Sequence, residues 1–238
     1  MLSSNAFKRL AVRNQTTELN IKREYVQNLF LSYFYQKPWA REIFFKGGTA
    51  LKIVYQSSRF SEDLDFSSTI TNKKLIEEMV VDVLKDIKKT NLKARLIESK
   101  KTSGGYLAII EFMLPLVIKI QLEISFREKN IQGEVVTVVN DFVPTYSLIS
   151  LERDELVRQK IKALMERRKP RDFYDLYFIL RANLLSVNER KVLVKILPMI
   201  EESKIYFERE LGLFLPKNQW MIIKDFKKVL KREIGRYV

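Results

Sequence analysis

The sequence contains no cysteine and no histidine among its 238 residues. The lack of cysteine excludes disulfide bonds and thiolate metal sites. The lack of histidine excludes imidazole metal ligands, a histidine general base and a Ser–His–Asp triad. Any bound metal must therefore be held by oxygen atoms, which favours a hard ion such as magnesium or manganese.

Glycine and proline are also scarce, with 7 and 6 residues, so long flexible linkers are not expected. No apolar run reaches the roughly 18 residues that a membrane span requires. The N-terminal stretch lacks the apolar region of a secretory signal peptide. We therefore expect a cytoplasmic protein with no membrane partner, and its hydrophobic content of 46% is enough for a real core.

Positive charge is abundant, because 43 lysines and arginines face 29 acidic residues and give a formal charge of +14. Such an excess favours a polyanionic partner, which is a nucleic acid, a nucleotide or an acidic protein. The alternative is a solvated surface that is merely basic.

The pattern of apolar residues divides the chain into two domains. Residues 1–146 predict an α+β domain, and residues 147–238 predict a helical domain that is more densely basic. In the first domain we expect helices over 17–36, 49–56 and 72–89 and strands over 43–46 and 62–67, followed by four strands between residues 93 and 139.

The segment FFKGGTALKIVYQSSRFSEDLDF, residues 44–66, carries the first chemical signal. Gly47 and Gly48 end a predicted strand and begin a predicted helix, where backbone N–H groups can bind an anion. Thr49 adds a hydroxyl there, although it also suits an ordinary helix N-cap.

The same segment places Asp63 and Asp65 two positions apart on one predicted strand, so both carboxylates point to one face. Two such carboxylates repel unless a cation lies between them, and a divalent ion there can also bind a phosphate. A D-x-D pattern alone is more often the acidic, solvent-facing side of a strand. The adjacent glycine pair favours a site for a triphosphate and its metal.

A third carboxylate is expected on the strand VIKIQLEISF, residues 117–126. Its alternation puts Lys119, Gln121, Glu123 and Ser125 on one face, and Glu123 is the only acid there. Glu123 can complete an acidic triad and act as a general base. The alternative is a solvent-facing glutamate on a half-exposed strand.

These motifs together resemble the nucleotidyltransferase superfamily and, more narrowly, its AbiEii/AbiGii (MenT-like) toxin branch. The matching stretches are GGTAL at 47–51, RFSEDLDF at 59–66, Lys160, and RDFYDL at 171–176. The resemblance implies a nucleotidyltransferase fold, with a mixed β-sheet flanked by helices and followed by a helical domain.

The resemblance also implies roles for individual residues. It assigns the metal to Asp63, Asp65 and Glu123, catalysis to these three with Lys160 and Asp175, and nucleotide binding to Gly47, Gly48, Thr49, Arg59, Ser61, Lys160 and Asp172. Other interpretations remain for the later residues. Lys160 suits a surface lysine, Asp172 suits the start of a helix after Pro170, and Asp175 suits an ion pair with Lys160 or a basic neighbour.

The implied activity is magnesium- or manganese-dependent transfer of a nucleoside monophosphate from an NTP to an acceptor hydroxyl. Related toxins modify the 3′ end of tRNA and act in toxin–antitoxin or AbiE-like phage-defence systems, so RNA and a cognate antitoxin are expected partners. Two other hypotheses remain: a non-catalytic nucleotide- or RNA-binding protein on the same fold, and a metal-dependent nuclease.

Overall fold

The computed structural model describes residues 2–203 and 205–238 and separates them into two compact units. One unit comprises residues 1–56 and 60–152 and contains the β-sheet; we call it the sheet unit. The other comprises residues 57–59 and 153–238; we call it the helical unit. The described helices include none that is both long and apolar enough to cross a membrane.

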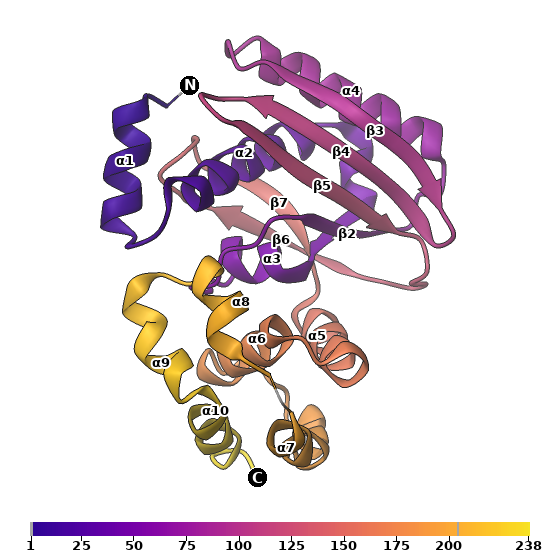
Figure 1. Cartoon of the computed structure of the whole chain (residues 1–238). Helices are drawn as coiled ribbons and strands as arrows, with labels where there is room; N and C mark the ends of the chain where they lie inside the picture. Colours follow the sequence, from indigo (N-terminus) through magenta and orange to yellow (C-terminus); the bar gives the residue numbers. More distant parts are fainter. Residues whose placement is uncertain (1, 204) are drawn as a thin grey trace. The chain divides into compact units, whose positions relative to one another are not determined.

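The sheet unit contains four α-helices, one short 3-10 helix (Pro38–Glu42) and seven strands in the described residues (Figure 1). The helices are α1 (Ser4–Arg13), α2 (Glu18–Phe34), α3 (Gly47–Ile53) and α4 (Lys73–Lys88). The strands are β1 (Ile43–Lys46), β2 (Leu64–Ser68), β3 (Ala94–Thr102), β4 (Gly105–Met113), β5 (Val117–Ser125), β6 (Gly133–Val138) and β7 (Tyr146–Leu151).

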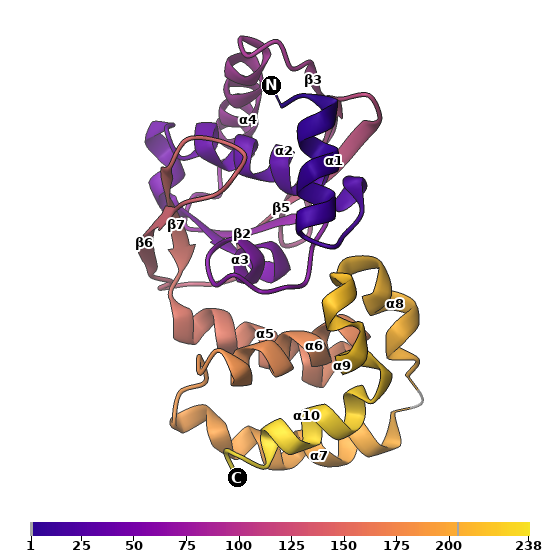
Figure 2. The ribbon, with the colours of Figure 1, turned by 90° about the vertical axis from the view of Figure 1, so that its left-hand side faces the viewer.

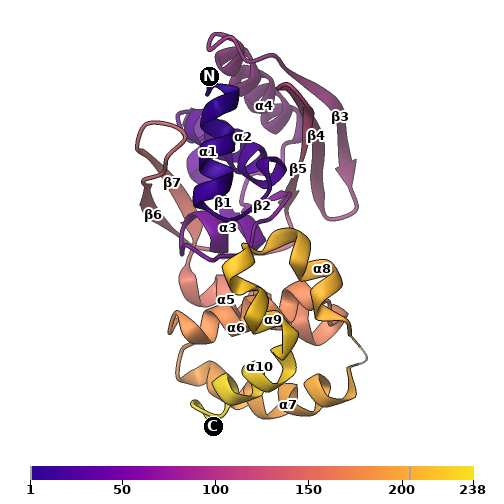
Figure 3. The same cartoon turned by 60° about the vertical axis from the view of Figure 1, so that its left-hand side comes forward.

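The sheet is mixed and runs in the order β3-β4-β5-β2-β1-β7-β6. Its central strand β2 pairs antiparallel with β1 and parallel with β5, and β1 pairs parallel with β7. Helices α2 and α4 lie together against one face, and α1 packs on α2 (Figures 1 and 3). The other face of β5 is open, because its residues alternate between buried and solvent-facing positions.

Aromatic residues form the centre of the sheet unit's core. Phe34 of α2 lies 5.5 Å from both Phe30 and Phe66, measured between ring centroids, and Phe45 of β1 lies 5.4 Å from Phe66. All four side chains are fully buried. Burial of each large apolar side chain contributes roughly 1.5–3 kcal/mol, so this cluster fixes α2 on the strands that carry the candidate site.

The helical unit consists of α5 (Arg153–Arg167), α6 (Pro170–Arg181), α7 (Leu193–Glu202), α8 (Phe207–Phe214), α9 (Trp220–Lys224) and α10 (Phe226–Ile234). Helices α5 and α6 pack against each other, and α10 contacts both α6 and α7 (Figure 2). Their shared core includes Leu164, Phe173, Leu176, Ile196 and Leu230. This apolar core explains why the periodic segments after residue 152 fold as helices.

The boundary between the units lies later in the chain than the predicted division at residue 146. Residues 146–151 form β7, which pairs with β1 and β6 inside the sheet. The prediction extended a helix back through Leu148 and Ile149, because their apolar side chains look continuous with those of α5. In addition, residues 57–59 pack with the helices rather than with the sheet.

Candidate active site

The polar residues of the predicted site meet on the open face of the sheet. Lys46 of β1 lies directly opposite Asp65 of β2, and Asp65 lies directly opposite Glu123 of β5. Residues opposite each other in neighbouring strands share a face and are about 4.8 Å apart in the backbone. The fold therefore joins three strands, distant in sequence, into one row of a cation and two carboxylates.

Gly47 is required directly beside this row. Its backbone φ angle is +85°, a conformation that glycine adopts without steric penalty. A Cβ atom at this position would lie only 2.1 Å from the Asp65 Oδ2 atom. The absence of a side chain at Gly47 thus allows the Asp65 carboxylate to stand against the backbone where β1 turns into α3.

The row opens into a cavity of about 450 Å³. Its charged lining consists of Lys46, Asp65, Glu123, Arg127 and Glu128. The Lys46 Nζ atom is 2.9 Å from Glu128 Oε1, and the Ser125 hydroxyl donates to Glu128 Oε2 at 2.5 Å. Burial raises the pKa of Glu128, but the bonds from Ser125 and Lys46 outweigh that effect and hold the pKa below its ordinary value.

Asp63 lies immediately before β2 rather than within it, so the predicted strand begins two residues too early. Its carbonyl oxygen accepts a hydrogen bond from the hydroxyl of Thr49, which is fully buried. The Gln27 amide likewise donates to the carbonyl of Ser61, at 2.9 Å. Side chains from α2 and α3 thus fix the backbone of the D-x-D segment, and Thr49 has a structural role there.

Three predicted site residues form a buried ion network inside the helical unit. Arg59 donates through Nε and Nη2 to the two oxygens of Asp175, at 2.8 and 3.1 Å, and Lys160 Nζ lies 2.8 Å from Asp175 Oδ2. The side chains are 5%, 2% and 11% exposed for Arg59, Asp175 and Lys160. Burial raises the pKa of Asp175, but the two cations outweigh it and lower the pKa overall.

Asp172 takes part in a different, local arrangement at the start of α6. Its carboxylate accepts a hydrogen bond from the Lys169 backbone N–H at 3.1 Å. Arg167 binds the same carboxylate through Nε and Nη2, with a shortest distance of 2.8 Å. This is the helix-start interpretation of Asp172, and it accounts for the burial of the carboxylate.

The structure thus distributes the predicted residues between the two units. Gly47, Gly48, Thr49, Ser61, Asp63, Asp65 and Glu123 belong to the sheet unit, whereas Arg59, Lys160, Asp172 and Asp175 belong to the helical unit. Within the described ranges, 2–203 and 205–238, no three acidic side chains lie close enough to ligate one ion together. The oxygen donors Asp65 and Glu123 nevertheless fit magnesium, which commonly takes one or two protein carboxylates and completes its shell with phosphates and water.

Only Asp65 and Glu123 of the residues that line the cavity were predicted as site residues; its other polar lining residues include Lys46, Ser125, Arg127 and Glu128. Ser125 shares the open face of β5 with Glu123, so strand alternation was sufficient to place it beside the site. Arg127 and Glu128 lie in the loop after β5, where no periodic pattern indicates the direction of a side chain.

The chain is similar to known proteins over nearly its whole length. The model of the family described as "Nucleotidyl transferase AbiEii toxin, Type IV TA system" matches residues 29–232. The structure of JHP933 from Helicobacter pylori aligns with a TM-score of 0.66 at 18% identity, covering 93% of this chain and 94% of that chain. MenT4, the nucleotidyltransferase toxin Rv2826c from Mycobacterium tuberculosis H37Rv, aligns with a TM-score of 0.65 at 16% identity, covering 99% of this chain and 89% of that chain.

These similarities confirm the predicted fold, a mixed sheet with helices followed by C-terminal helices. At identities below 20% the structural likeness concerns the fold alone. No curated protein sequence matches this chain.

Proposed function

Because this chain belongs to the AbiEii family of nucleotidyltransferase toxins, we propose that it transfers a nucleoside monophosphate from an NTP to a hydroxyl at the 3′ end of tRNA. The observation that carries this proposal is the alignment of Asp65 with Glu123 on the open face of the sheet, at the wall of a cavity. Such a pair suits phosphoryl transfer, where positioning and charge neutralisation supply most of the catalysis.

Magnesium or manganese fits the donors of this site. Asp65 and Glu123 would hold the ion; the D-x-D motif predicts Asp63 as a further ligand, but no three acidic side chains of the described residues lie close enough to share one ion. When bound, the ion supplies neutralisation of charge on the phosphates. If the protein supplies only two carboxylates, the remaining coordination positions of the ion are open to the triphosphate, which is the usual arrangement for magnesium.

In the proposed reaction the acceptor hydroxyl oxygen forms a bond to the α-phosphorus, and the bond from that phosphorus to the bridging oxygen breaks, so pyrophosphate leaves. Glu123 takes the proton of the hydroxyl as general base. Lys46 stabilises phosphate charge, since it stands opposite Asp65 in the strand register and lines the same cavity. Gly47 and Gly48 keep the turn before α3 free of side chains, next to Asp65.

We keep Lys160, Arg59, Asp172 and Asp175 as proposed nucleotide-binding residues, because they match the motifs of the family. Their contacts indicate different roles for the two aspartates. Asp175 orients Lys160, whose ammonium is the contact offered to a nucleotide, whereas Asp172 secures the start of α6. Asp172 and Asp175 therefore act as positioning residues in this proposal.

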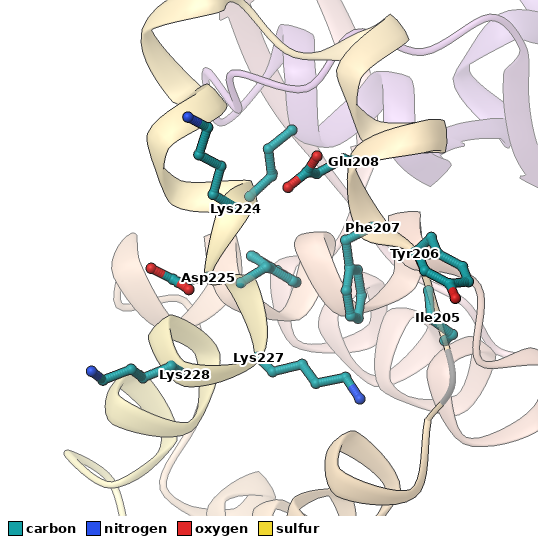
Figure 4. A pocket seen from close by; sticks show the side chains of 10 residues that line it. Ile205, Tyr206, Phe207, Glu208, Lys224, Asp225, Lys227 and Lys228 are labelled. Atoms are coloured by element: carbon teal, nitrogen blue, oxygen red, sulfur yellow. The ribbon is translucent and has the colours of Figure 1, made fainter.

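RNA as acceptor is supported by charge and by an exposed aromatic residue on the helical unit. A pocket of about 410 Å³ lies between the residues before α8 and the junction of α9 with α10 (Figure 4). Three lysines, Lys224, Lys227 and Lys228, outnumber two acidic residues, Glu208 and Asp225, in its lining, and Tyr206 beside them is 86% exposed. Lysines beside an exposed ring suit phosphates and stacked bases of single-stranded RNA.

The family assignment also supports a cognate antitoxin as the biological partner, since the family model describes the toxin of a type IV toxin–antitoxin system. We place the action of the toxin in the cytoplasm, because tRNA and NTPs are available there.

The proposal is tested by incubating the protein with labelled NTPs, magnesium or manganese, and total RNA. We expect label to appear in tRNA with the native chain and to be lost with Asp65→Asn. Asp82→Asn is the matched control, because Asp82 is an exposed residue of α4 that pairs with Lys85 on the same helix. Shortened RNA without label would indicate the nuclease, and RNA binding without either would indicate the non-catalytic binding protein.

A further inference from the structure

The cavity beside Asp65 and Glu123 contains a second cation whose role the proposed mechanism leaves open. Lys46 is engaged by Glu128 at 2.9 Å. Arg127 lines the same cavity, is exposed, and forms no ion pair with any carboxylate in the described part of the chain. An exposed guanidinium on a wall that also carries Asp65, Glu123 and Glu128 adds positive charge to a lining in which carboxylates outnumber cations.

The position of Arg127 is set by the turn between β3 and β4. A Cβ atom on Gly104 would lie 2.0 Å from Arg127 Nε and 2.6 Å from Arg127 Cζ, so the guanidinium occupies the space that a side chain would fill. The carbonyl of Gly104 accepts a hydrogen bond from the Phe126 N–H at 2.9 Å. The Arg127 N–H donates to the Ser125 hydroxyl at 3.3 Å. The turn and the loop therefore fix the backbone from which Arg127 extends over Gly104.

We propose that Arg127 binds a phosphate group of the nucleoside triphosphate and that Gly104 is the residue that permits its position. The inference rests on the proposed nucleotidyl transfer. A guanidinium offers parallel N–H donors that match two phosphate oxygens, and it remains charged at any physiological pH. A triphosphate entering this cavity meets three carboxylates, so an uncommitted guanidinium is the group best suited to receive its charge.

Gly104→Ala is a mild probe of this arrangement. The three atoms nearest to the added methyl group all belong to the far end of the flexible Arg127 side chain, and the backbone at Gly104 is not in the left-handed region. The variant should therefore fold normally while displacing the guanidinium. Gly212→Ala is the matched control, because a Cβ at Gly212 has no atom within 4 Å.

The experiment measures binding of inorganic tripolyphosphate with magnesium by calorimetry, which requires no turnover. We expect Arg127→Ala to weaken binding about tenfold or more, Gly104→Ala to weaken it several-fold, and Arg127→Lys to restore only part of the loss, because lysine is a point charge. The double variant should bind no worse than Arg127→Ala, since both changes act on one contact. Gly212→Ala should bind normally.

The inference is overturned if Arg127→Ala binds tripolyphosphate as tightly as the native chain, or if the two single losses add in the double variant. It is also overturned if Arg127→Ala weakens binding of RNA but not of tripolyphosphate, because Arg127 then serves the acceptor. Label transfer reports separately on the proposed function. Arg127-dependent tripolyphosphate binding without any label transfer would support the phosphate contact and contradict the proposed nucleotidyl transfer.

Discussion

The buried network of Arg59, Asp175 and Lys160 predicts that substitutions of Asp175 and Lys160 reduce stability by different amounts. Asp175 accepts two hydrogen bonds from Arg59 and one from Lys160, and its side chain is 2% exposed. Asp175→Ala removes the carboxylate that accepts both hydrogen bonds from the buried guanidinium of Arg59. Removal of one partner from a buried ion pair destabilises a protein by about 3–5 kcal/mol.

Lys160→Ala should have a smaller effect on stability. Asp175 keeps both bonds to Arg59, and only one charge-assisted hydrogen bond is lost, which contributes about 1.5–3 kcal/mol. Lys160 is also the most exposed of the three side chains, which further reduces the loss of stability expected from its removal. We therefore expect the free energy of unfolding to fall more in Asp175→Ala than in Lys160→Ala.

The assay is urea unfolding followed by far-UV circular dichroism, with label transfer measured on the same preparations at a temperature where each variant is folded. Glu166→Ala is the control, since Glu166 is an exposed partner of Lys162 on the same helix as Lys160 and should change stability by less than about 1 kcal/mol. If Lys160 contacts the nucleotide, Lys160→Ala should lose transfer far beyond its loss of stability.

Two results would refute this reasoning. One is an Asp175→Ala variant as stable as Glu166→Ala, which would mean that the network is not buried in solution. The other is a Lys160→Ala variant less stable than Asp175→Ala, which would mean that Lys160 and not Asp175 is the centre of the network.

Three further predictions concern single groups. Gly47→Ala should reduce stability by about 1–2 kcal/mol and abolish label transfer, because its positive φ disfavours alanine and the new methyl group displaces the Asp65 carboxylate; normal transfer would contradict this. Thr49→Val should lower the free energy of unfolding in urea by about 1–3 kcal/mol, because the hydrogen bond from Thr49 to the Asp63 carbonyl is lost, whereas Thr49→Ser should keep that bond. If Thr49→Val changes only the KM for NTP, the result would instead support the predicted phosphate contact. The lowered pKa of Asp175 means that its ion pairs stabilise the fold above the ordinary pKa of about 4 and are lost as pH falls through the folded-state pKa. The stability difference between the native chain and Asp175→Asn should therefore shrink below about pH 4, and a constant difference would argue against the shift.

The elements that sequence predicted well are those whose own side chains determine their burial. Helix α2 and helix α4 carry long periodic apolar faces, and strand β1 is a short apolar run that ends at a glycine pair. Strand β7 was missed because it depends on pairing with β1 and β6, which are distant in sequence. Helix α1 was not predicted either, although Ser3 caps its first turn.

The same distinction applies to the candidate site. The alternation of β5 was enough to place Glu123 on the open face, and the register with Asp65 confirms that the two residues lie side by side. The ladder of β2 begins only after Asp63, whose carbonyl accepts a hydrogen bond from the hydroxyl of Thr49. Loop residues such as Arg127 and Glu128 depend on contacts with Gly104 and Lys46 that no local pattern encodes.

The motif RFSEDLDF therefore combines two kinds of residue that a sequence comparison treats alike. Arg59 is buried with Asp175 in the helical unit, and removal of either residue breaks a buried ion pair. Asp65 lines a cavity in the sheet unit beside Glu123, where it is accessible to a ligand. Loss of transfer in an Arg59 or Asp175 variant is consequently compatible with a defect in folding, whereas loss in a folded Asp65→Asn variant reports on chemistry. Stability measurements must accompany every activity measurement on this motif, because only they distinguish residues needed for folding from residues that contact the ligand.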